Sequence, residues 1–583
     1  MRNYATVRDM GLRREQRRLP AWARCGYLLA FANLLAAPQL ALGEARIEWM
    51  IPGPDGTIEL QLTTADEARF HADGLPVAAD QSNQRRWRLA AIPTTSRVLV
   101  VQPTTGDPIA VALGPDDGPG GRYNDWNIYH VMLSFFANGS RDNDKYGMRK
   151  WIHRNYAGGD LQGVLARADY LDGLGVNAVW LSPVFATETS HGYDVTNYFE
   201  IGQSFAVPRD PDASRELFDQ LVTELQRRGI RVILDLPLDY GSGAYDRRAG
   251  DPQRRRPKST GPRQEAEKMW ESWGTDFKYW NFDDRETREF LKDVARYWVT
   301  DGLVDGFRLD YVRGVPHDFW AELYADLKSV KPSVYLFVEA WQDASSVTAN
   351  ALDIASYYAP VSGAGPQFDG LLEYPLQMVM TEVFATGGDA RQLEHWLQRT
   401  AALYDPSGRP VHFLDNHDVS RFAAWAVDSG KDRLAAAVGF MAALSSPLVI
   451  YYGTETGLSG GSARRGFVDD GRVAMPWGAL DEALTGRIAE ILQLRSTVPA
   501  ITHGGRWPVH VDAQTLVMRK VHPTGDVLVG VNLAAEPRTV TFPAGRDAEY
   551  SGLLGTSVPE VAGDGNTRWT LPALSTTWVR VRR

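Results

Sequence analysis

This sequence has very little cysteine and no excess of positive charge. A single cysteine, Cys25, occurs among 583 residues, which excludes an intramolecular disulfide framework and any zinc or redox site built from paired cysteines. The formal net charge is −10. The chain therefore lacks the basic excess that binding to nucleic acid or an anionic membrane requires, and we expect neither partner.

A long apolar run is also lacking. The run at residues 26–37 has only 12 residues, which is too short to cross a bilayer as a helix. Seven arginines precede it, and small residues follow, a pattern typical of an export signal. We expect residues 1–43 to be a signal peptide, cut after Gly43 or Ala45, and the mature chain to be periplasmic or secreted, without an integral membrane segment. The alternative is a disordered tail before a buried helix.

Composition and periodicity divide the rest of the chain into three parts. Residues 45–115 contain short alternating apolar runs, such as residues 56–62, which predict an N-terminal β domain. The stretch 114–121 is rich in Gly, Pro and Asp and marks a boundary. Residues 122–498 form the main domain. Residues 500–583 return to strand patterning and predict a C-terminal β domain.

The main domain alternates apolar runs of strand length with helical patterns. Because these runs are apolar on both faces, they are typical of a parallel sheet covered by helices. At least six strand–helix units favour a closed (β/α)₈ TIM barrel, an α/β fold, over a small doubly wound sheet. The predicted strands are residues 176–181, 231–238, 303–309, 333–340, 411–416 and 447–453.

Two segments between these strands show clear helical spacing, and one shows none. Apolar residues recur every three or four positions at 217–225 and 290–298, with Gly229 and Gly302 as the following C-cap candidates. Residues 241–264 are rich in Gly, Pro and Arg and have no periodicity. They predict a surface insertion at about residues 240–283, after the third barrel strand.

Charged residues stand where several of the predicted strands end. In a barrel of this kind the working residues lie at the C-terminal strand ends, so acids there are informative. Taken singly, each acid could be a helix N-cap or an ion-pair partner. Converging carboxylates raise at least one pKa, which suits the division of acid and base roles in glycosidic bond cleavage. The charged and polar residues at these strand ends are Asp235, Arg308, Asp310, Glu339, Asp415, Asn416, His417 and Asp418.

Seven short motifs in this order resemble the α-amylase family, glycoside hydrolase family 13. They are "GGDLQGV" (158–164), "HGYD" (191–194), "DLPLDY" (235–240), "GFRLD" (306–310), "FVEAW" (337–341), "FLDNHD" (413–418) and "IYYGTETG" (450–457). The resemblance runs from about residue 129 to 457 and is nearest to the neopullulanase, cyclomaltodextrinase and cyclodextrin glucanotransferase branches. It implies a (β/α)₈ barrel, an insertion domain after the third strand and a C-terminal β sandwich.

The resemblance also implies roles for individual residues. Asp310 would be the nucleophile, Glu339 the general acid/base, and Asp418 the carboxylate that holds the sugar in its distorted form. Two close carboxyls imply retention of configuration through a covalent intermediate. Arg308 would keep Asp310 ionised. The implied substrate-binding residues are Tyr193, Asp194, Arg308, His417, Tyr240, Trp341 and Asp235.

A structural calcium ion is the cofactor that the resemblance implies. The run at residues 135–144 is similar to a loop that calcium joins to the "GGD" turn in the relatives, and oxygen-rich loops suit this hard cation. The alternative is a turn whose Asx side chains bond their own backbone. The implied ligands are Asn138, Asn143, Asp144, the Gly158 carbonyl and Asp160.

Some positions depart from the family pattern, and several functions stay open. Asp239 and Tyr240 stand where the family usually has Asn-His, and Arg313 and Gly314 stand where it often has Lys-His. We expect a hydrolase of α-1,4-glucosidic bonds in starch, maltooligosaccharides or cyclodextrins. The alternatives are a glucanotransferase with the same intermediate and a non-catalytic carbohydrate-binding protein. The N-terminal domain could bind glucan, join a homodimer or pack on the barrel.

Overall fold

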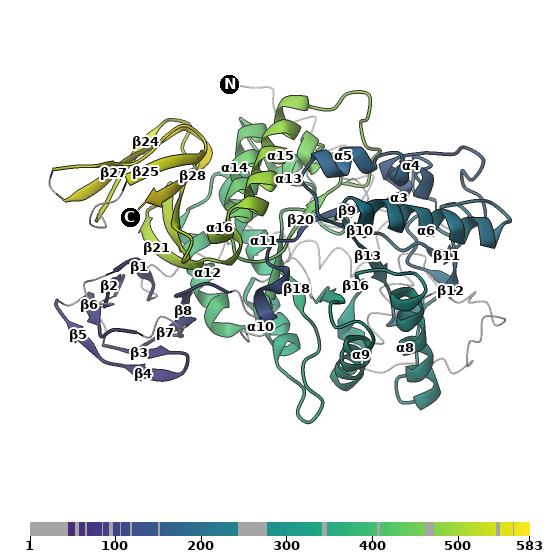
Figure 1. The fold of residues 1–583 in the computed structure, drawn as a ribbon, viewed down its shortest axis with the longest axis horizontal. Coiled ribbons are helices and arrows are strands. Elements are labelled where there is room, and N and C mark those ends of the chain that lie inside the picture. The colour runs from purple at the N-terminus through teal and green to yellow at the C-terminus, as the bar shows by residue number, and fades with distance from the viewer. Residues whose placement is uncertain are drawn as a thin grey trace, which may run out of the picture.

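A central barrel and two sheet domains make up the computed structural model (Figure 1). The N-terminal domain, purple in Figure 1, and the C-terminal domain, yellow, lie on the same side of the barrel. The signal peptide expected at residues 1–43 lies outside the described residues and stays a prediction. The structure describes residues 45–52, 57–64, 67–83, 85–92, 97–104, 106–116, 119–149, 152–242, 277–340, 347–404, 409–460, 471–543, 549–563 and 565–582.

Eight parallel strands close into a barrel, which confirms the predicted TIM-barrel fold. Six of them overlap the predicted runs, whereas β9 and β18 have no counterpart among those runs. In order around the barrel the strands are β9 (Asn127–Val131), β10 (Ala178–Leu181), β13 (Arg231–Leu236), β16 (Gly306–Leu309), β17 (Tyr335–Val338), β18 (Gly370–Leu372), β19 (Arg409–Phe413) and β20 (Leu448–Tyr451), which pairs with β9.

Large apolar side chains fill the inside of the barrel. Trp180, Phe337 and Phe413 belong to one buried cluster that also draws on β9, β13 and β20. The barrel is therefore a packed core and not a pore, so a site can form only where the strands end.

Helices cover the outside of the barrel, and α6 shows how the sequence sets their limits. Asp210 caps its N-terminus, Leu217, Leu221 and Leu225 are buried, and the chain leaves the helix before Gly229, whose φ of +77° favours glycine. The second predicted helix is α8. The α-helices are α3 (Leu133–Phe136), α4 (Leu161–Leu165), α5 (Ala168–Gly173), α6 (Pro211–Arg227), α8 (Arg285–Thr300), α9 (His317–Val330), α10 (Val347–Tyr358), α11 (Tyr374–Met380), α12 (Arg391–Leu403), α13 (Phe422–Trp425), α14 (Gly430–Ala442), α15 (Glu482–Thr497) and α16 (Pro499–His503).

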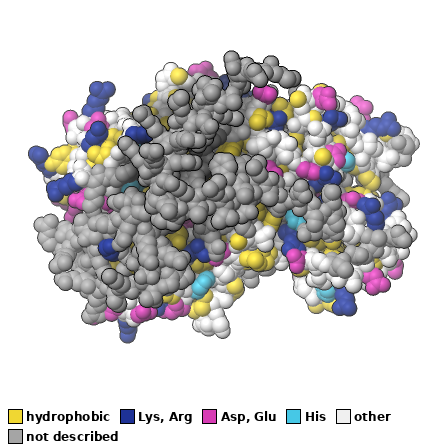
Figure 2. Space-filling model, turned by 180° about the vertical axis from the view of Figure 1, so that it is seen from behind, with side chains coloured by type: hydrophobic (Ala, Val, Ile, Leu, Met, Phe, Trp, Pro, Cys, Tyr) yellow, Lys and Arg dark blue, Asp and Glu magenta, His cyan; other side chains and the backbone are white. Residues whose placement is uncertain are grey.

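Several short helical turns complete the barrel domain. They are the 3₁₀ turns η2 (Pro119–Tyr123), η4 (Val312–Gly314) and η6 (Thr454–Thr456), and the π-helical turn η5 (Thr381–Ala385). Within the described residues, no helix has both the length and the apolar character that a membrane span needs. Positive and negative side chains are interspersed over the described part of the face that Figure 2 shows.

Two antiparallel ladders flank the third barrel strand. Strands β11 (Phe185–Thr187) and β12 (Val195–Ile201) form one, and β14 (Tyr240–Gly241) and β15 (Lys278–Tyr279) form the other. The second ladder stands at the ends of the predicted insertion. The interior of that insertion, residues 243–276, lies outside the described residues.

The N-terminal domain consists of two four-stranded sheets around a shared apolar core that includes Leu60, Trp87 and Leu99. It contacts α12 of the barrel and β21 of the C-terminal domain. Of the three roles expected for this domain, these contacts bear on packing; glucan binding and dimerisation stay predictions. Its strands are β1 (Ile47–Pro52), β2 (Ile58–Leu62), β6 (Arg86–Leu89) and β5 (Ala79–Gln81) in one sheet, and β4 (Leu75–Val77), β3 (Ala68–Ala72), β7 (Val98–Pro103) and β8 (Ile109–Ala112) in the other.

The C-terminal domain is a sandwich of a five-stranded and a three-stranded sheet. One apolar cluster joins the two sheets through Val517, Trp569 and Val579. The larger sheet contains β21 (Gly505–Val511), β22 (Thr515–Val521), β23 (Asp526–Asn532), β28 (Ser575–Arg582) and β25 (Glu549–Leu554); the smaller contains β24 (Arg538–Pro543), β27 (Asn566–Leu571) and β26 (Glu560–Val561).

A buried ion pair lies where the three domains meet. Arg506 of β21 donates to both carboxylate oxygens of Glu394 in α12 at 2.8 Å, and both side chains are at least nine-tenths buried. Gln398 of α12 donates to Glu394 and exchanges two hydrogen bonds with the backbone of Ile47 in β1. The pair therefore connects all three domains.

Replacing Arg506 by alanine should destabilise the protein strongly, because it leaves the Glu394 carboxylate buried without its cation. The expected cost is about 3–5 kcal/mol. Scanning calorimetry of wild type and Arg506→Ala would measure it as a lower unfolding midpoint. The control is Arg538→Ala, whose partner Glu536 is exposed, with an expected cost of at most about 1 kcal/mol. Equal midpoints for the two variants would contradict the argument.

Candidate active site

One buried arginine connects three carboxylates at the C-terminal end of the barrel. Arg308 donates from Nη1 to Asp235 at 2.9 and 3.1 Å and to Oδ1 of Asp310 at 2.5 Å. Its Nη2 donates to Oε2 of Glu339 at 2.6 Å. Since one planar guanidinium reaches all three acids, they lie around a common centre.

The barrel strands determine this meeting point. Asp235 of β13 lies beside Arg308 of β16 in the parallel register, and Asp310 follows two positions later on the same face. Glu339 directly follows β17, the next strand. The backbone then turns sharply at Tyr311, which has a left-handed φ of +38°. Such a conformation in a residue other than glycine costs about 1–3 kcal/mol and is typical of functional sites.

Burial dominates the electrostatics of Asp310 and Asp235. It raises the pKa of Asp310 well above its usual value, and the negative charges of Glu339 and Asp235 raise this pKa further. Burial also raises the pKa of Asp235. Arg308 opposes both increases, so its effect on Asp310 has the expected sign, but burial outweighs it. The nucleophile candidate therefore needs further donors to carry its charge.

Three tyrosine hydroxyls supply such donors. Tyr240 donates to Oδ2 of Asp310 at 2.5 Å, and Tyr374 donates to Oε1 of Glu339 at 2.9 Å. Tyr193 donates to Asp235 at 2.8 Å, and its hydroxyl also lies 2.7 Å from Nε2 of His417. Each acid around Arg308 thus has a tyrosine partner.

The third expected catalytic acid joins the same network through His417. Oδ2 of Asp418 lies 3.0 Å from Nε2 of His417, and Arg472 donates to Oδ1 at 3.1 Å. Burial alone would raise the pKa of Asp418, but His417 and Arg472 outweigh it and lower this pKa below the usual value. The Asp418 side chain is 22% exposed, more than those of Asp310 and Glu339, so it is the acid most open to a ligand.

The structure thus brings together most of the residues that the sequence singled out, while their contacts with sugar stay predictions. Asp194 accepts hydrogen bonds from Thr187 and Thr189. These bonds stabilise the loop between β11 and β12. Asp415 accepts from the Phe422 amide and the Thr454 hydroxyl, a structural role of the kind weighed for single acids. Trp341 lies outside the described residues.

Comparison with known proteins identifies this architecture. The family model for the catalytic domain of alpha amylase matches residues 130–254 and 274–481, more than half of the chain. Neopullulanase 2 from Thermoactinomyces vulgaris is 31% identical over 440 residues, which covers 71% of this chain and 70% of that protein. The chain belongs to the α-amylase family. It is a glycosidase of the α-amylase type.

Other members of the α-amylase family agree in sequence and in fold. A cyclomaltodextrinase from a Bacillus species is 29% identical over 65% of this chain and 66% of its own. Among solved structures, a cyclomaltodextrinase superposes with a TM-score of 0.66 at 21% identity and covers 92% of this chain and 98% of its own. The α-amylase of Geobacillus thermoleovorans gives 0.67 at 24% identity and covers 79% and 99%. These structural likenesses show the fold.

Several residues of the network were not predicted from the sequence. Trp180 donates from its indole to Asp235 at 3.0 Å, and His130 stacks on it with ring centroids 3.6 Å apart. Tyr374, whose hydroxyl accepts a hydrogen bond from the predicted residue Asn416 at 3.1 Å, was also missed. Trp180 and His130 lie inside strands, and Arg472 lies in a loop, so neither strand-end position nor charge pairing could have indicated them. Tyr374 follows β18, a strand that the apolar pattern did not predict.

The residues of the expected calcium loop also lie together. The Asn138 amide donates to Asp144 at 2.8 Å, and a Cβ built on Gly158 would meet both side chains within 2.3 Å. Asn143 is buried, and its Oδ1 accepts no hydrogen bond from the described residues. These amide and carboxylate oxygens suit calcium.

Asp160 is bonded differently from the other four calcium candidates. Its two oxygens accept hydrogen bonds from the amides of Gly139, Ser140 and Gly163 and from the side chain of Asn143. This is the pattern of the Asx-turn alternative, and it also caps α4. In the described ranges, no group of three or more His, Cys, Asp or Glu side chains could hold a metal, so calcium would depend on amide and carbonyl oxygens in addition to the Asp144 carboxylate.

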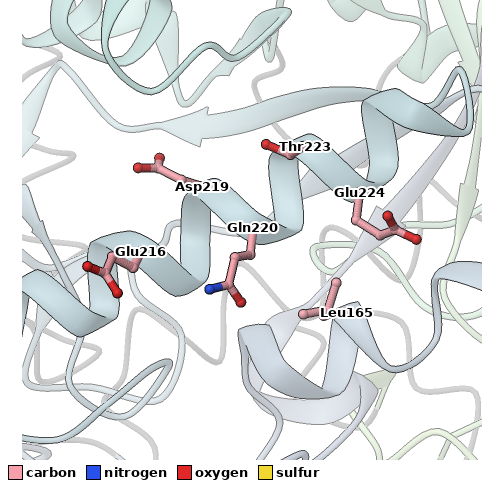
Figure 3. Close-up of a pocket in the computed structure, with 6 residues that line it drawn as sticks. All are labelled: Leu165, Glu216, Asp219, Gln220, Thr223 and Glu224. Carbon is pink, nitrogen blue, oxygen red and sulfur yellow. The ribbon is translucent and has the colours of Figure 1, made fainter.

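A shallow hollow on the outer face of α6 is unconnected with this chemistry (Figure 3). Glu216, Asp219, Glu224 and Leu165 are among its lining residues, and the side chains of α6 point outward from the helix there. Asp219 pairs with Arg215 along the helix. The hollow is therefore a charged surface between α4 and α6.

Glu373 is a further buried acid beside the site. It precedes Tyr374, is 1% exposed, and accepts a hydrogen bond from the Tyr404 hydroxyl at 3.0 Å. Burial raises the pKa of Glu373 from 4.5 to about 8. Between these two pH values the folded chain binds a proton that the unfolded chain has lost, so stability falls as pH rises.

Replacing Glu373 by glutamine should remove this penalty. The free energy of unfolding of Glu373→Gln, relative to wild type, should increase by about 1.4 kcal/mol per pH unit between pH 5 and 8. Urea unfolding at a series of pH values would measure the difference. Glu536→Gln, at an exposed acid, should follow wild type throughout. A constant difference between Glu373→Gln and wild type would show that Glu373 is ionised in the folded chain.

Proposed function

We propose that this chain is a retaining glycosidase that cleaves α-1,4-glucosidic bonds in starch, maltooligosaccharides or cyclodextrins. The observation that supports this most directly is the meeting of Asp310 and Glu339 on one buried guanidinium, with Asp418 in the same network. Two carboxyls close together suit a double displacement, in which the first acts as nucleophile and the second as acid and then base. The names of two relatives, neopullulanase and cyclomaltodextrinase, support the substrate class.

In the first step Asp310 attacks the anomeric carbon while Glu339 gives its proton to the leaving glycosidic oxygen. The bond from carbon to that oxygen breaks as the bond to Asp310 forms. Arg308 holds both carboxyls in place, which keeps the nucleophile and the acid at a fixed spacing. Tyr374 fixes the other oxygen of Glu339.

In the second step water attacks the same carbon from the face that the leaving group vacated. Glu339 takes the proton of that water, and the electron pair of the broken ester bond returns to Asp310. Asp418 stays ionised, because His417 and Arg472 lower its pKa, and it can accept hydrogen bonds from sugar hydroxyls. Those bonds favour the distorted ring of the transition state.

Transfer to a sugar acceptor instead of water is the alternative that shares the first step. One of the fold neighbours is named a cyclomaltodextrin glucanotransferase. On the acceptor side of this chain Arg313 pairs with Asp353 at 2.7 Å. Products decide between the two: longer or cyclic oligosaccharides would indicate transfer, and glucose or maltose would indicate hydrolysis.

We also propose that a structural calcium ion binds the loop at residues 138–144. The oxygens of Asn138, Asn143 and Asp144 and the Gly158 carbonyl would hold it, and Asp160 would support the loop backbone. The ion would neutralise the oxygen-rich loop and join it to the turn before α4. It takes no part in bond cleavage.

Replacing Asp310 by asparagine should abolish turnover, because an amide cannot form the glycosyl ester. The expected loss in kcat is at least about 10³-fold on soluble starch, maltotriose and β-cyclodextrin, measured by reducing-sugar release and chromatography. Asp219→Asn, the same change in the hollow of Figure 3, should keep the wild-type rate. Binding of starch by wild type without any release of sugar would favour the non-catalytic alternative instead.

Removal of calcium should lower the thermal unfolding midpoint. After EDTA treatment the midpoint should fall, and added Ca²⁺, but not an equal concentration of Mg²⁺, should restore it. Asp144→Ala should abolish the response, whereas Asp142→Ala, in the same exposed loop, should keep it. An unchanged midpoint of wild type in EDTA and in Ca²⁺ would leave the loop as an Asx turn without a metal.

A further inference from the structure

The two oxygens of the proposed nucleophile have different hydrogen-bond donors. Oδ1 of Asp310 accepts from the Arg308 guanidinium, and Oδ2 accepts from the Tyr240 hydroxyl, both at 2.5 Å. The first donor is a cation that is shared with Asp235 and Glu339. The second donor is a neutral phenol aimed at Asp310. Tyr240 stands where the α-amylase family usually has histidine.

Contacts away from the catalytic acids hold Tyr240 in place. Its ring stacks on Phe277 with centroids 4.3 Å apart at an angle of 20°, and its backbone pairs with Tyr279 across the β14–β15 ladder. Its carbonyl accepts a hydrogen bond from the Tyr198 hydroxyl at 2.9 Å. The residue is 4% exposed. The hydroxyl is therefore directed at Asp310 before any substrate binds.

The surroundings keep Tyr240 a donor and make a donor necessary. Burial and the charge of Asp310 raise the pKa of Tyr240 well above its usual value, so the hydroxyl keeps its proton. Negative charge on Asp310 is opposed by neighbouring acids and favoured by Arg308. Asp239 is buried and also lies beside Asp310, whose charge raises the pKa of Asp239 further above its usual value. Among the described residues, the titratable and charged groups that act on Asp310 include Asp235, Asp239, Glu339, Arg308, Tyr193 and Tyr240.

We propose that Tyr240 is a positioning residue whose hydroxyl stabilises Asp310 as the leaving group when the glycosyl-enzyme is hydrolysed. This inference rests on the proposed retaining function. In the intermediate Asp310 is a neutral ester. Water bonds to the anomeric carbon and gives its proton to Glu339, while the bond between that carbon and Asp310 breaks. The electron pair of the broken bond returns to the Asp310 carboxylate, which accepts the hydrogen bond from Tyr240.

The hydroxyl acts unequally on the two steps. A hydrogen bond to a carboxylate is stronger than one to an ester carbonyl, so it strengthens as Asp310 departs and weakens as Asp310 attacks. Removing it should therefore slow the second step more than the first. The rate constant of the hydrolysis step should fall about tenfold, because part of the free energy of a charged hydrogen bond is lost from its transition state.

The test compares wild type with Tyr240→Phe, which keeps the ring on Phe277 and removes only the hydroxyl. The substrates are aryl α-maltosides with leaving phenols of graded acidity, and the phenol released in the first milliseconds is followed by stopped flow. Tyr240→Phe should show a burst of phenol, kcat and KM should fall together, and kcat should no longer depend on the phenol. Acid quenching followed by mass spectrometry should detect the maltosyl adduct on Asp310.

The control is Tyr324→Phe, which removes a tyrosine–aspartate hydrogen bond to Asp369, outside the catalytic network. It should resemble wild type, with no burst. A fall in the kcat of Tyr240→Phe with KM unchanged or raised, and with no adduct, would overturn the inference while wild type remains active. A folding defect would lower the thermal midpoint but would not lower KM. If wild type releases no phenol from any maltoside, the proposed function itself fails.

Discussion

The catalytic end of this barrel is organised around the charge of Arg308. A guanidinium with no exposed surface is stable there only because Asp235, Asp310 and Glu339 surround it; burial alone would lower its pKa, and these acids raise it. The same contacts fix the spacing of the proposed nucleophile and acid. One cation does not balance three carboxylates, so the tyrosine hydroxyls are needed as neutral donors. Removing any one acid would leave the others in a different electrostatic environment.

The rest of the fold keeps that arrangement rigid. Asp235 and Arg308 belong to neighbouring strands in fixed register, and the packed layer beneath them contains Trp180 and Phe337. The barrel has no open edge, so no strand can slide without breaking its hydrogen bonds to the strands on both sides. The side domains pack on its outside, where Glu394 and Arg506 connect them. The polar network therefore rests on the apolar interior of the barrel, and an ion pair fixes the side domains to the barrel surface.

The sequence could predict the elements that repeat and the residues that end them. Apolar runs of strand length predicted six barrel strands, and position at a strand end predicted Asp310 and Glu339. The same criteria could not predict β18, which has three residues, or β9, where His130 interrupts the apolar pattern. Arg472 reaches Asp418 only through the tertiary fold, since it is 54 residues away along the chain. Periodicity carries no information on such contacts.

The choice of donor at Tyr240 follows from the charge around Asp310. A cation in that position would bind the carboxylate more strongly, but it would also hold back the electron pair that must attack the sugar. A phenol binds the carboxylate less strongly, and its hydrogen bond strengthens as charge returns to Asp310. Because Asp239 and Glu339 already oppose that charge, a neutral donor is enough to change the balance between the two steps. In the proposed mechanism, this departure from the family pattern would therefore act on the lifetime of the glycosyl-enzyme intermediate.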